Sequence, residues 1–312
     1  MYLKSNINVG AQFKLIKHKG DASKPTEETD YFHNLVLDSG LERMSVGSVL
    51  GYVSVGSGNS IPNISQTSLD NFIASTNSQN GADAVGNQLV TKPYYSWARR
   101  TYRFNAGVAA GNLSEIGVGW TSTNLFNRTL IKDLNGNPTT LTVLNDEFLD
   151  VIVEIRAYPQ EIITGSFNLL DKLGNIKSNH TISGTCLFIS SPSFILGNVL
   201  LGAYTDWAGG ERMTVFSGDA GTSVTISPQG TVDNTDYSKT TYPTAKSCRN
   251  KAILRLDMAN MLHKSFVIPV SRLCSPETSQ NGYKIQIEPP ILKNPNMEIQ
   301  YTFELSWGRY TP

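Results

Sequence analysis

The sequence predicts an all-β protein of two β-sandwich or barrel-like domains, with long loops and one or two short helices. Along the chain, apolar residues alternate with polar ones or form short blocks bounded by turn-forming residues. Only 17% of the 312 residues are charged, so serine, threonine, asparagine and glycine must cover much of the surface, which suits strands better than helices. The clearest strand patterns are GYVSVGSG (51–58), TTLTVLND (139–146), DVIVEIRAYP (150–159), TVFSGDAGTSVTIS (214–227) and YKIQIEPP (283–290).

The length and one change of pattern indicate two domains. The 312 residues exceed the size at which a single compact core is most common. A long strand pattern ends in AYPQE (157–161), and GSFNLLDKLGN (165–175) begins a new one. We therefore expect a first β-rich domain over residues 1–160 and a second β-sandwich over 161–312. Because the join is short, the two should pack together.

Turn and helix signals define two further elements. In TLIKDLNGNPTTLTVL (129–144), Asn135 and Gly136 favour the positive φ angles of a tight turn, so we expect a hairpin there. In SQTSLDNFIAS (65–75), apolar residues recur at helical spacing after a serine that can cap the first turn, so we expect a helix. The segment NKAILRLDMANMLHKS (250–265) fits either a buried helix or a strand followed by a turn.

The polar composition of two segments predicts long exposed loops at residues 77–93 and 227–247. Loops of this length in a compact domain are usually functional or are ordered by a partner. We expect contacts with other molecules there.

Charge and cysteine content exclude several classes of protein. The 26 basic and 26 acidic residues balance, which argues against a nucleic-acid-binding protein. The three cysteines, at positions 186, 248 and 274, form no Cys-x-x-Cys pair, so neither a zinc knuckle nor a redox motif is expected. The sequence shows no secretory signal pattern and no apolar run long enough to span a membrane, so we expect a soluble protein made in the cytoplasm, without membrane insertion.

No motif for catalysis, a cofactor or a metal stands out. VGSGNS (55–60) lacks the third glycine and the following helix of a dinucleotide site. DLNGN (133–137) resembles the start of a calcium loop, but Leu144 stands where the bidentate glutamate would be. The four histidines have no metal-ligand spacing. We expect no catalytic, cofactor-binding or metal-binding residue.

A glycosidase is the alternative to a noncatalytic protein, because the chain has several candidate acids. Glycosidases use two acids about 5 to 9.5 Å apart. Strand alternation places Asp150 and Glu154 on one face. We expect that face to be solvated and its acids to pair with arginines. The full set of candidate acids is Glu115, Asp146, Glu147, Asp150, Glu154, Asp206, Glu211 and Asp219.

The segment WARRTYRF (97–104) is the first candidate interaction surface. Arg100 and Arg103 lie there beside Arg99 and several tyrosines, and protein interfaces favour arginine and aromatic residues. Contacts with phosphate or sugar are the alternative.

Residues 115–130 carry the second set of candidate interface or packing residues. Glu115 can form an ion pair with Arg103 or Arg128 across a sheet. The alternative is an exposed salt bridge at the rim, which contributes little to stability. Trp120 should pack against the preceding glycines. Phe126 and Leu130 lie on a strand with two half-apolar faces, which we expect a second sheet and a neighbouring subunit to cover.

Five stretches together resemble a group of tailed-bacteriophage virion proteins described as tail fibre or minor tail structural proteins. They cover most of residues 33–159 and the last ten or so. The stretches are HNLVLDSGLERM (33–44), YVSVGSGNSIPNISQTSLDNFIAS (52–75), RTYRFNAGVAAGNLSEIGVGW (100–120), LFNRTLIKDLNGNPTTLTVLNDEFLDVIVEIRAYP (125–159) and YTFELSWGRY (301–310).

The resemblance implies a noncatalytic β-rich subunit located in the virion, which assembles as a homo-oligomer with other phage tail or neck proteins. A collagen-like, coiled-coil or β-helical shaft is not evident in the sequence, which favours a compact ring, collar or adaptor subunit over a whole fibre. A neck, collar or head decoration protein is the alternative within this class. In another class, loops with Tyr204 and Trp207 would bind a host surface glycan.

Overall fold

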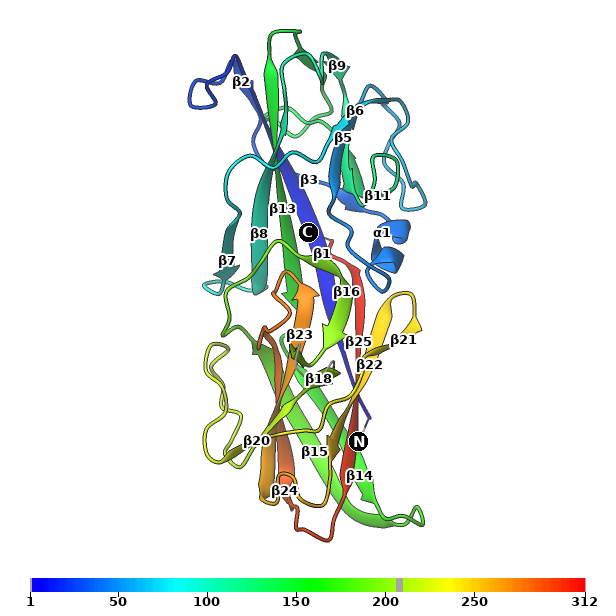
Figure 1. The fold of residues 1–312 in the computed structure, drawn as a ribbon, viewed down its shortest axis with the longest axis vertical. Helices are drawn as coiled ribbons and strands as arrows, with labels where there is room; N and C mark the ends of the chain where they lie inside the picture. The colour runs from blue at the N-terminus through cyan, green and yellow to red at the C-terminus, as the bar shows by residue number, and fades with distance from the viewer. Residues whose placement is uncertain (1, 206–209, 312) are drawn as a thin grey trace.

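The computed structural model describes residues 2–205 and 210–311 and is almost entirely β, with 54% strand and 2% helix. The strands form several sheets in sandwich-like packing, so the predicted all-β fold is confirmed. The molecule is elongated, and its longest strands run along the long axis (Figure 1).

A nine-stranded sheet passes through the middle of the molecule (Figure 1). Its strands, in order across the sheet, are β21 (Thr241–Thr244), β22 (Ser247–Leu254), β25 (Ile299–Arg309), β1 (Tyr2–His18), β13 (Phe148–Pro159), β8 (Tyr95–Phe104) and β7 (Ala84–Gln88), with β2 (Glu27–Glu28) and β3 (Phe32–His33) also paired to β1.

Strand β1 joins the two ends of the chain within this sheet. It pairs antiparallel with β13 from Ile7 to His18, and parallel with β25 from Tyr2 to Val9. Its odd-numbered residues from Val9 to Leu15 face the core and alternate with more polar ones, as expected for a strand covered on one face.

Four smaller sheets complete the fold. The five-stranded sheet consists of β4 (Leu35–Val36), β11 (Leu125–Leu130), β10 (Glu115–Gly119), β5 (Tyr52–Gly56) and β6 (Phe72–Thr76). The seven-stranded sheet consists of β14 (Ile163–Leu170), β15 (Ile176–Leu187), β24 (Gly282–Leu292), β23 (Leu262–Leu273), β19 (Thr214–Phe216) and β20 (Val232–Asn234), with β16 (Leu196–Leu201) on β23. Two pairs remain, β12 (Leu141–Val143) with β9 (Gly111–Leu113), and β17 (Ala203–Thr205) with β18 (Gly210–Arg212).

The boundary placed at residue 160 stays a prediction, but strands from both sides of it share one sheet. The nine-stranded sheet contains β1, β7, β8 and β13 from the first half and β21, β22 and β25 from the second. One apolar cluster likewise includes Phe13 and Val153 together with Phe266 and Tyr301. The two halves therefore pack through a common core.

The helix predicted over residues 65–75 is wrong. Its second half is strand β6, and residues before it form turns. The backbone amides of Asp70 and Asn71 donate to the buried carboxylate of Glu115, which takes them out of any helical ladder. The one helix described in residues 2–205 and 210–311 is α1 (Asp38–Arg43), which lies on β11. The segment 250–265 takes the strand alternative, with a turn between β22 and β23.

The turn predicted at Asn135 and Gly136 is confirmed, but the strands around it do not form a hairpin ladder. Gly136 has a φ of +81° and donates to the carbonyl of Asp133 at 3.0 Å. Beyond a single bridge between Lys132 and Pro138, β11 pairs with β10 and β4 while β12 pairs with β9.

The two predicted loops carry short strands of their own. Strand β7 lies within residues 77–93, and β20 and β21 lie within 227–247. Local polarity hid these strands because each is short and lies at the edge of a sheet.

Candidate functional site

Glu115 and Arg128 form a buried ion pair on neighbouring strands β10 and β11. The Nε of Arg128 donates to Oε2 of Glu115 at 2.8 Å, and neither side chain is exposed. The sequence predicted Arg128 as one of two candidate partners, and the structure selects it over Arg103. The pair lies inside the protein, so the alternative of an exposed rim pair is wrong.

The same pair holds the long segment between β5 and β6. Glu115 accepts backbone N–H groups from Gly58 at 2.9 Å and from Asn71 at 2.8 Å. Arg128 donates to Gln66 at 2.7 Å and to Asp70 at 2.6 Å. Every charge of the pair is thus matched by a hydrogen bond, and its role is to fix residues 57–71 on the sheet.

The predicted packing residues of 115–130 are covered by this chain itself. Phe126 is fully buried and packs against Gly40 of α1, and Leu130 is buried as well. Trp120 is half-buried, with the guanidinium of Arg43 5.6 Å from its ring centre. Both faces of β11 are covered, as expected, but without a neighbouring subunit. Trp207 lies outside the described residues.

Arg100 and Arg103 point to opposite faces of β8. Arg100 makes two hydrogen bonds to Asp83, at 2.7 and 2.8 Å, and lies over the ring of Phe194. Arg103 makes two hydrogen bonds of 2.7 Å to Asp150. Each arginine is therefore engaged within the chain.

The buried Asp150 also faces His18, yet the group lacks the arrangement of a catalytic triad. The Nε2 of His18 lies 3.4 Å from Asp150, and its Nδ1 accepts the backbone N–H of Gly20 at 3.1 Å. Arg103 binds both carboxylate oxygens of Asp150, and both ring nitrogens of His18 already have partners. Neither group is therefore free to activate a nucleophile.

Asp150 and Glu154 share a face of β13, as predicted, but they are buried rather than solvated. Glu154 accepts from Gln12 at 2.9 Å, from Arg156 at 2.5 Å and from Arg99. The prediction that arginines pair with these acids is confirmed.

Around Glu154, side chains of β8, β13 and the flanking segments form what we call the arginine–aromatic surface. Its members are at most half-exposed and lie on one face of the nine-stranded sheet. They are Tyr31, Tyr95, Trp97, Arg99, Arg156, Tyr158 and Tyr310.

The rings and guanidinium groups of this surface stack on one another. Arg99 lies over Trp97, 4.4 Å from the ring centre, and over Tyr31 at 5.0 Å. Tyr158 stacks on Tyr310 with ring centres 3.7 Å apart, and Tyr95 lies 4.9 Å from Tyr158. Stacking holds these side chains in place, which reduces the side-chain entropy that binding at this surface would cost.

The faces of Trp97 are occupied. Its ring lies so close to Gly86 of β7 that a Cβ there would be 2.7 Å from Cζ2, and Arg99 stacks against the ring as well. A sugar needs a free aromatic face to stack on. Trp97 therefore offers its ring edge rather than a free face.

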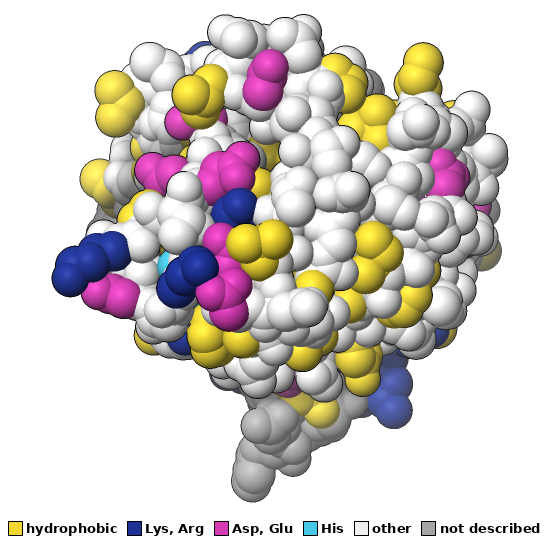
Figure 2. All heavy atoms as spheres, turned by 90° about the horizontal axis from the view of Figure 1, so that it is seen from above, with side chains coloured by type: hydrophobic (Ala, Val, Ile, Leu, Met, Phe, Trp, Pro, Cys, Tyr) yellow, Lys and Arg dark blue, Asp and Glu magenta, His cyan; other side chains and the backbone are white. Residues whose placement is uncertain are grey.

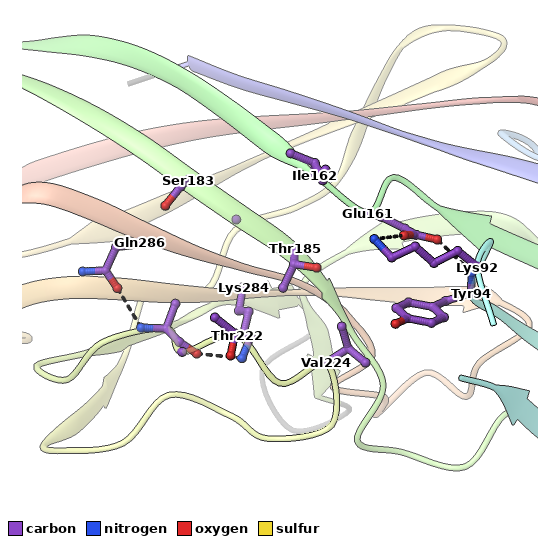
Figure 3. Close-up of a pocket in the computed structure, with 13 residues that line it drawn as sticks. Lys92, Tyr94, Glu161, Ile162, Ser183, Thr185, Thr222, Val224, Lys284 and Gln286 are labelled. Carbon is purple, nitrogen blue, oxygen red and sulfur yellow. Dashed lines mark hydrogen bonds and ion pairs between the residues drawn. The ribbon is translucent and has the colours of Figure 1, made fainter. Parts of the chain in front are cut away.

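A pocket of about 480 Å³ is lined by residues 92 and 94 from the first half of the chain and by residues from the second half (Figure 3). On one side the ion pair of Lys92 and Glu161, 2.8 Å apart, lies beside Tyr94. On the other, the buried Lys284 lies beside Thr222 and donates to the carbonyls of Ala220 and Ile226 at 2.7 and 3.1 Å.

Burial lowers the pKa of the Lys284 ammonium group, because desolvation disfavours its charged form. In the described residues, the hydroxyls of Tyr94, Ser183 and Thr222 make no hydrogen bond to protein and line the pocket. They can therefore bind a ligand rich in hydroxyl groups.

Charges of both signs are mixed at the upper end of the molecule. Seen from above, acidic and basic side chains gather together on one side, and apolar ones are scattered over the rest (Figure 2). Such a mixture provides no single-sign patch on this end.

No group of three or more His, Cys, Asp or Glu side chains suited to a metal occurs in the part of the chain that the structure describes. All three cysteines are free and buried. Among the described residues, no helix has the length and apolarity needed to cross a membrane.

No family model, curated protein or solved structure matches the chain. Its function must therefore be inferred from its own residues and geometry.

Proposed function

We propose that this protein is a noncatalytic structural subunit of a tailed-bacteriophage particle, which assembles as an oligomer in the tail, its adsorption apparatus or the neck. The observation that carries the proposal is the arginine–aromatic surface. It combines the residue types that contribute most to protein interfaces with a central Trp97 ring whose faces are already covered.

Two further features of the fold favour a subunit that keeps a fixed shape. Strand β1 pairs with β13 and β25 and ties the two ends of the chain into one sheet. The Glu115–Arg128 pair holds residues 57–71 on the sheet through hydrogen bonds. A subunit that must present a fixed shape to its neighbours benefits from both features. The proposed location in the virion rests on the sequence resemblance to tail fibre and minor tail proteins. A collar or head decoration protein is the alternative within that class.

Mass spectrometry of purified particles tests the location. A phage lysate that contains this chain is fractionated by density, and the proposal expects the chain to band with the major capsid protein in a fixed ratio. Recovery of the chain only in the soluble fraction would overturn it. Light scattering and electron microscopy of the purified chain then give the copy number and symmetry.

The pocket in Figure 3 favours a second candidate function, the binding of a host surface glycan. Free hydroxyls of Ser183 and Thr222, a tyrosine ring and a carboxylate line one cavity, and these groups match the hydrogen bonds and apolar faces of a sugar. Saturation-transfer NMR with host oligosaccharides tests this function. Signals that vanish in Tyr94→Ala support it, and the lack of any transfer in the wild type rules it out for those sugars.

A further inference from the structure

Strand β14 is the longest strand at the margin of any main sheet. It runs for eight residues and pairs only with β15 among the described strands. The other terminal strands of the three large sheets are shorter, from two to six residues: β4, β6, β7, β16, β20 and β21. One long row of backbone N–H and C=O groups is thus left free along β14.

The sequence of β14, ITGSFNLL, contains neither a charged residue nor proline. Soluble proteins usually block a long edge with lysine, proline, a bulge that twists it away, or a covering segment. The pairing of β14 with β15 has one irregularity, between Leu169 and Leu170 at the end of the strand, and the register is continuous from Ile163 to Leu169. Ile163 and Phe167 point into the core, while Thr164, Ser166 and Asn168 are exposed. Because β14 pairs only with β15, its other edge is open and able to pair.

Apolar side chains surround the end of this hairpin. Leu170, Leu173 and Ile176 are 54%, 87% and 60% exposed, and Leu173 lies in the turn between β14 and β15. The hairpin projects at the lower end of the molecule (Figure 1). Exposed apolar residues gathered at one projecting element indicate a contact surface.

A groove of about 580 Å³ lies next to the hairpin. Leu170 and Leu292 line it together with Met297, and Leu292 is 67% exposed. Its rim carries lysines 172 and 177 and acids 171 and 298, so the two signs balance. A surface with balanced charge does not repel a copy of itself.

We propose that β14 pairs antiparallel with β14 of a second copy of this chain, across a two-fold axis. The apolar residues of the hairpin and groove add buried area, since a stable contact needs roughly 800 Å² from each partner. This inference rests on the proposed function only in its claim that the chain self-assembles.

The length of β14 favours a two-fold arrangement over a head-to-tail one. A head-to-tail contact would pair β14 with a different edge of the neighbour, and the other terminal strands offer at most six residues. Among the described edges, the one that matches all eight residues of β14 is β14 itself. A two-fold contact of this kind is closed and yields a dimer.

Lysines introduced into β14 test the proposed contact between two copies of this strand. In the variant Ser166→Lys/Asn168→Lys, both new charges lie on exposed positions of β14 and oppose pairing. We expect the dimer dissociation constant to rise at least tenfold in analytical ultracentrifugation, with a circular dichroism spectrum that matches the wild type. The matched control is Val85→Lys on the edge strand β7, which should leave the dimer intact.

Cross-linking provides a second readout that does not depend on the lysines. The natural cysteines are fully buried, so single cysteines at positions 164, 166, 168 and 170 react without background. A short bis-maleimide reagent should join two chains through at least one of these positions, and through none when the cysteine replaces Val85.

The outcomes separate this inference from the function proposed above. An oligomer that persists in the double lysine variant and gives no cross-link overturns the β14 contact and leaves self-assembly standing. A wild-type chain that stays monomeric at high concentration also overturns the contact, while the presence of the chain in purified particles is decided independently.

Discussion

The guanidinium of Arg128 on β11 and the carboxylate of Glu115 on β10 meet in the interior, with Nε and Oε2 2.8 Å apart and neither side chain exposed. Buried charges are costly unless both are matched, so each partner depends on the other. The pair also holds the backbone of residues 58, 70 and 71, so its loss affects more than one strand.

Removal of the arginine should be severely destabilising. In Arg128→Met, the carboxylate of Glu115 stays buried without its counter-charge, and we expect a loss of about 3–5 kcal/mol in the free energy of unfolding. Urea denaturation followed by tryptophan fluorescence measures it. Lys19→Met, which breaks the exposed pair with Asp146, is the control and should leave the unfolding midpoint unchanged. Equal midpoints for the two variants would contradict a structural role for the buried pair.

Close packing of α1 on β11 leads to a second stability prediction. A Cβ on Gly40 would lie 2.5 Å from the carbonyl oxygen of Phe126, so Gly40→Ala must push the helix away. We expect a loss of about 1–3 kcal/mol. At Gly165 the nearest atoms to an added Cβ are 3.4 Å away, and Gly165→Ala should change stability by less than about 0.5 kcal/mol. Thermal unfolding of both variants tests the difference, and a stable Gly40→Ala protein would show that α1 adapts.

The sequence predicted the strands well where alternation is long, as in β13, and located the turn at Gly136. It missed α1 because the helix, DSGLER (38–43), is only six residues long and contains a glycine that is needed for contact with Phe126, not for helix formation. It also assigned a helix to 65–75, since helical spacing of apolar residues there is accidental and long-range bonds to Glu115 decide the conformation.

The interaction surface was only partly predictable. WARRTYRF showed the arginines and tyrosines of β8, but the partners Tyr31, Arg156 and Tyr310 come from distant segments that the sheet brings together. The open edge of β14 had no sequence signal of its own, because an edge exists only once strand order is known.

The three cysteines should be unreactive in the folded protein. Burial raises the pKa of the thiols of Cys186, Cys248 and Cys274, so little thiolate forms near neutral pH, and none of the three is exposed. A disulfide reagent such as DTNB at pH 8 should find no reactive thiol in the native protein and three per chain in urea. Rapid modification without denaturant would contradict this packing.

Stability should fall as the pH drops below about 6.5, because of His263. Burial lowers the pKa of this imidazole below its ordinary value of 6.5, and its Nε2 lies 2.8 Å from the carbonyl oxygen of Ala259. Between the lowered folded pKa and 6.5, the unfolded chain binds a proton that the folded chain excludes, so acid favours unfolding. His33 has a lowered pKa too, so the contribution of His263 is the difference between the wild type and His263→Gln. We measure the free energy of unfolding by urea titration from pH 7.5 to 5.5. It should decrease less with falling pH in the variant than in the wild type, and an identical pH dependence would refute the assignment to His263.

Trp97 offers the sharpest test of the arginine–aromatic surface. Its ring is half-exposed and held between Gly86 and Arg99, so Trp97→Ala removes a rigid contact residue at the centre of the surface. In particles grown on a host that supplies the variant in place of the wild-type chain, we expect incorporation to fall at least tenfold, as judged by quantitative mass spectrometry. Phe72→Ala on β6 is the control, because Phe72 is also an exposed aromatic residue but lies on a different sheet. Circular dichroism must show that both variants are folded. Normal incorporation of a folded Trp97→Ala protein would mean that this surface does not face a virion neighbour, and that assembly uses other contacts.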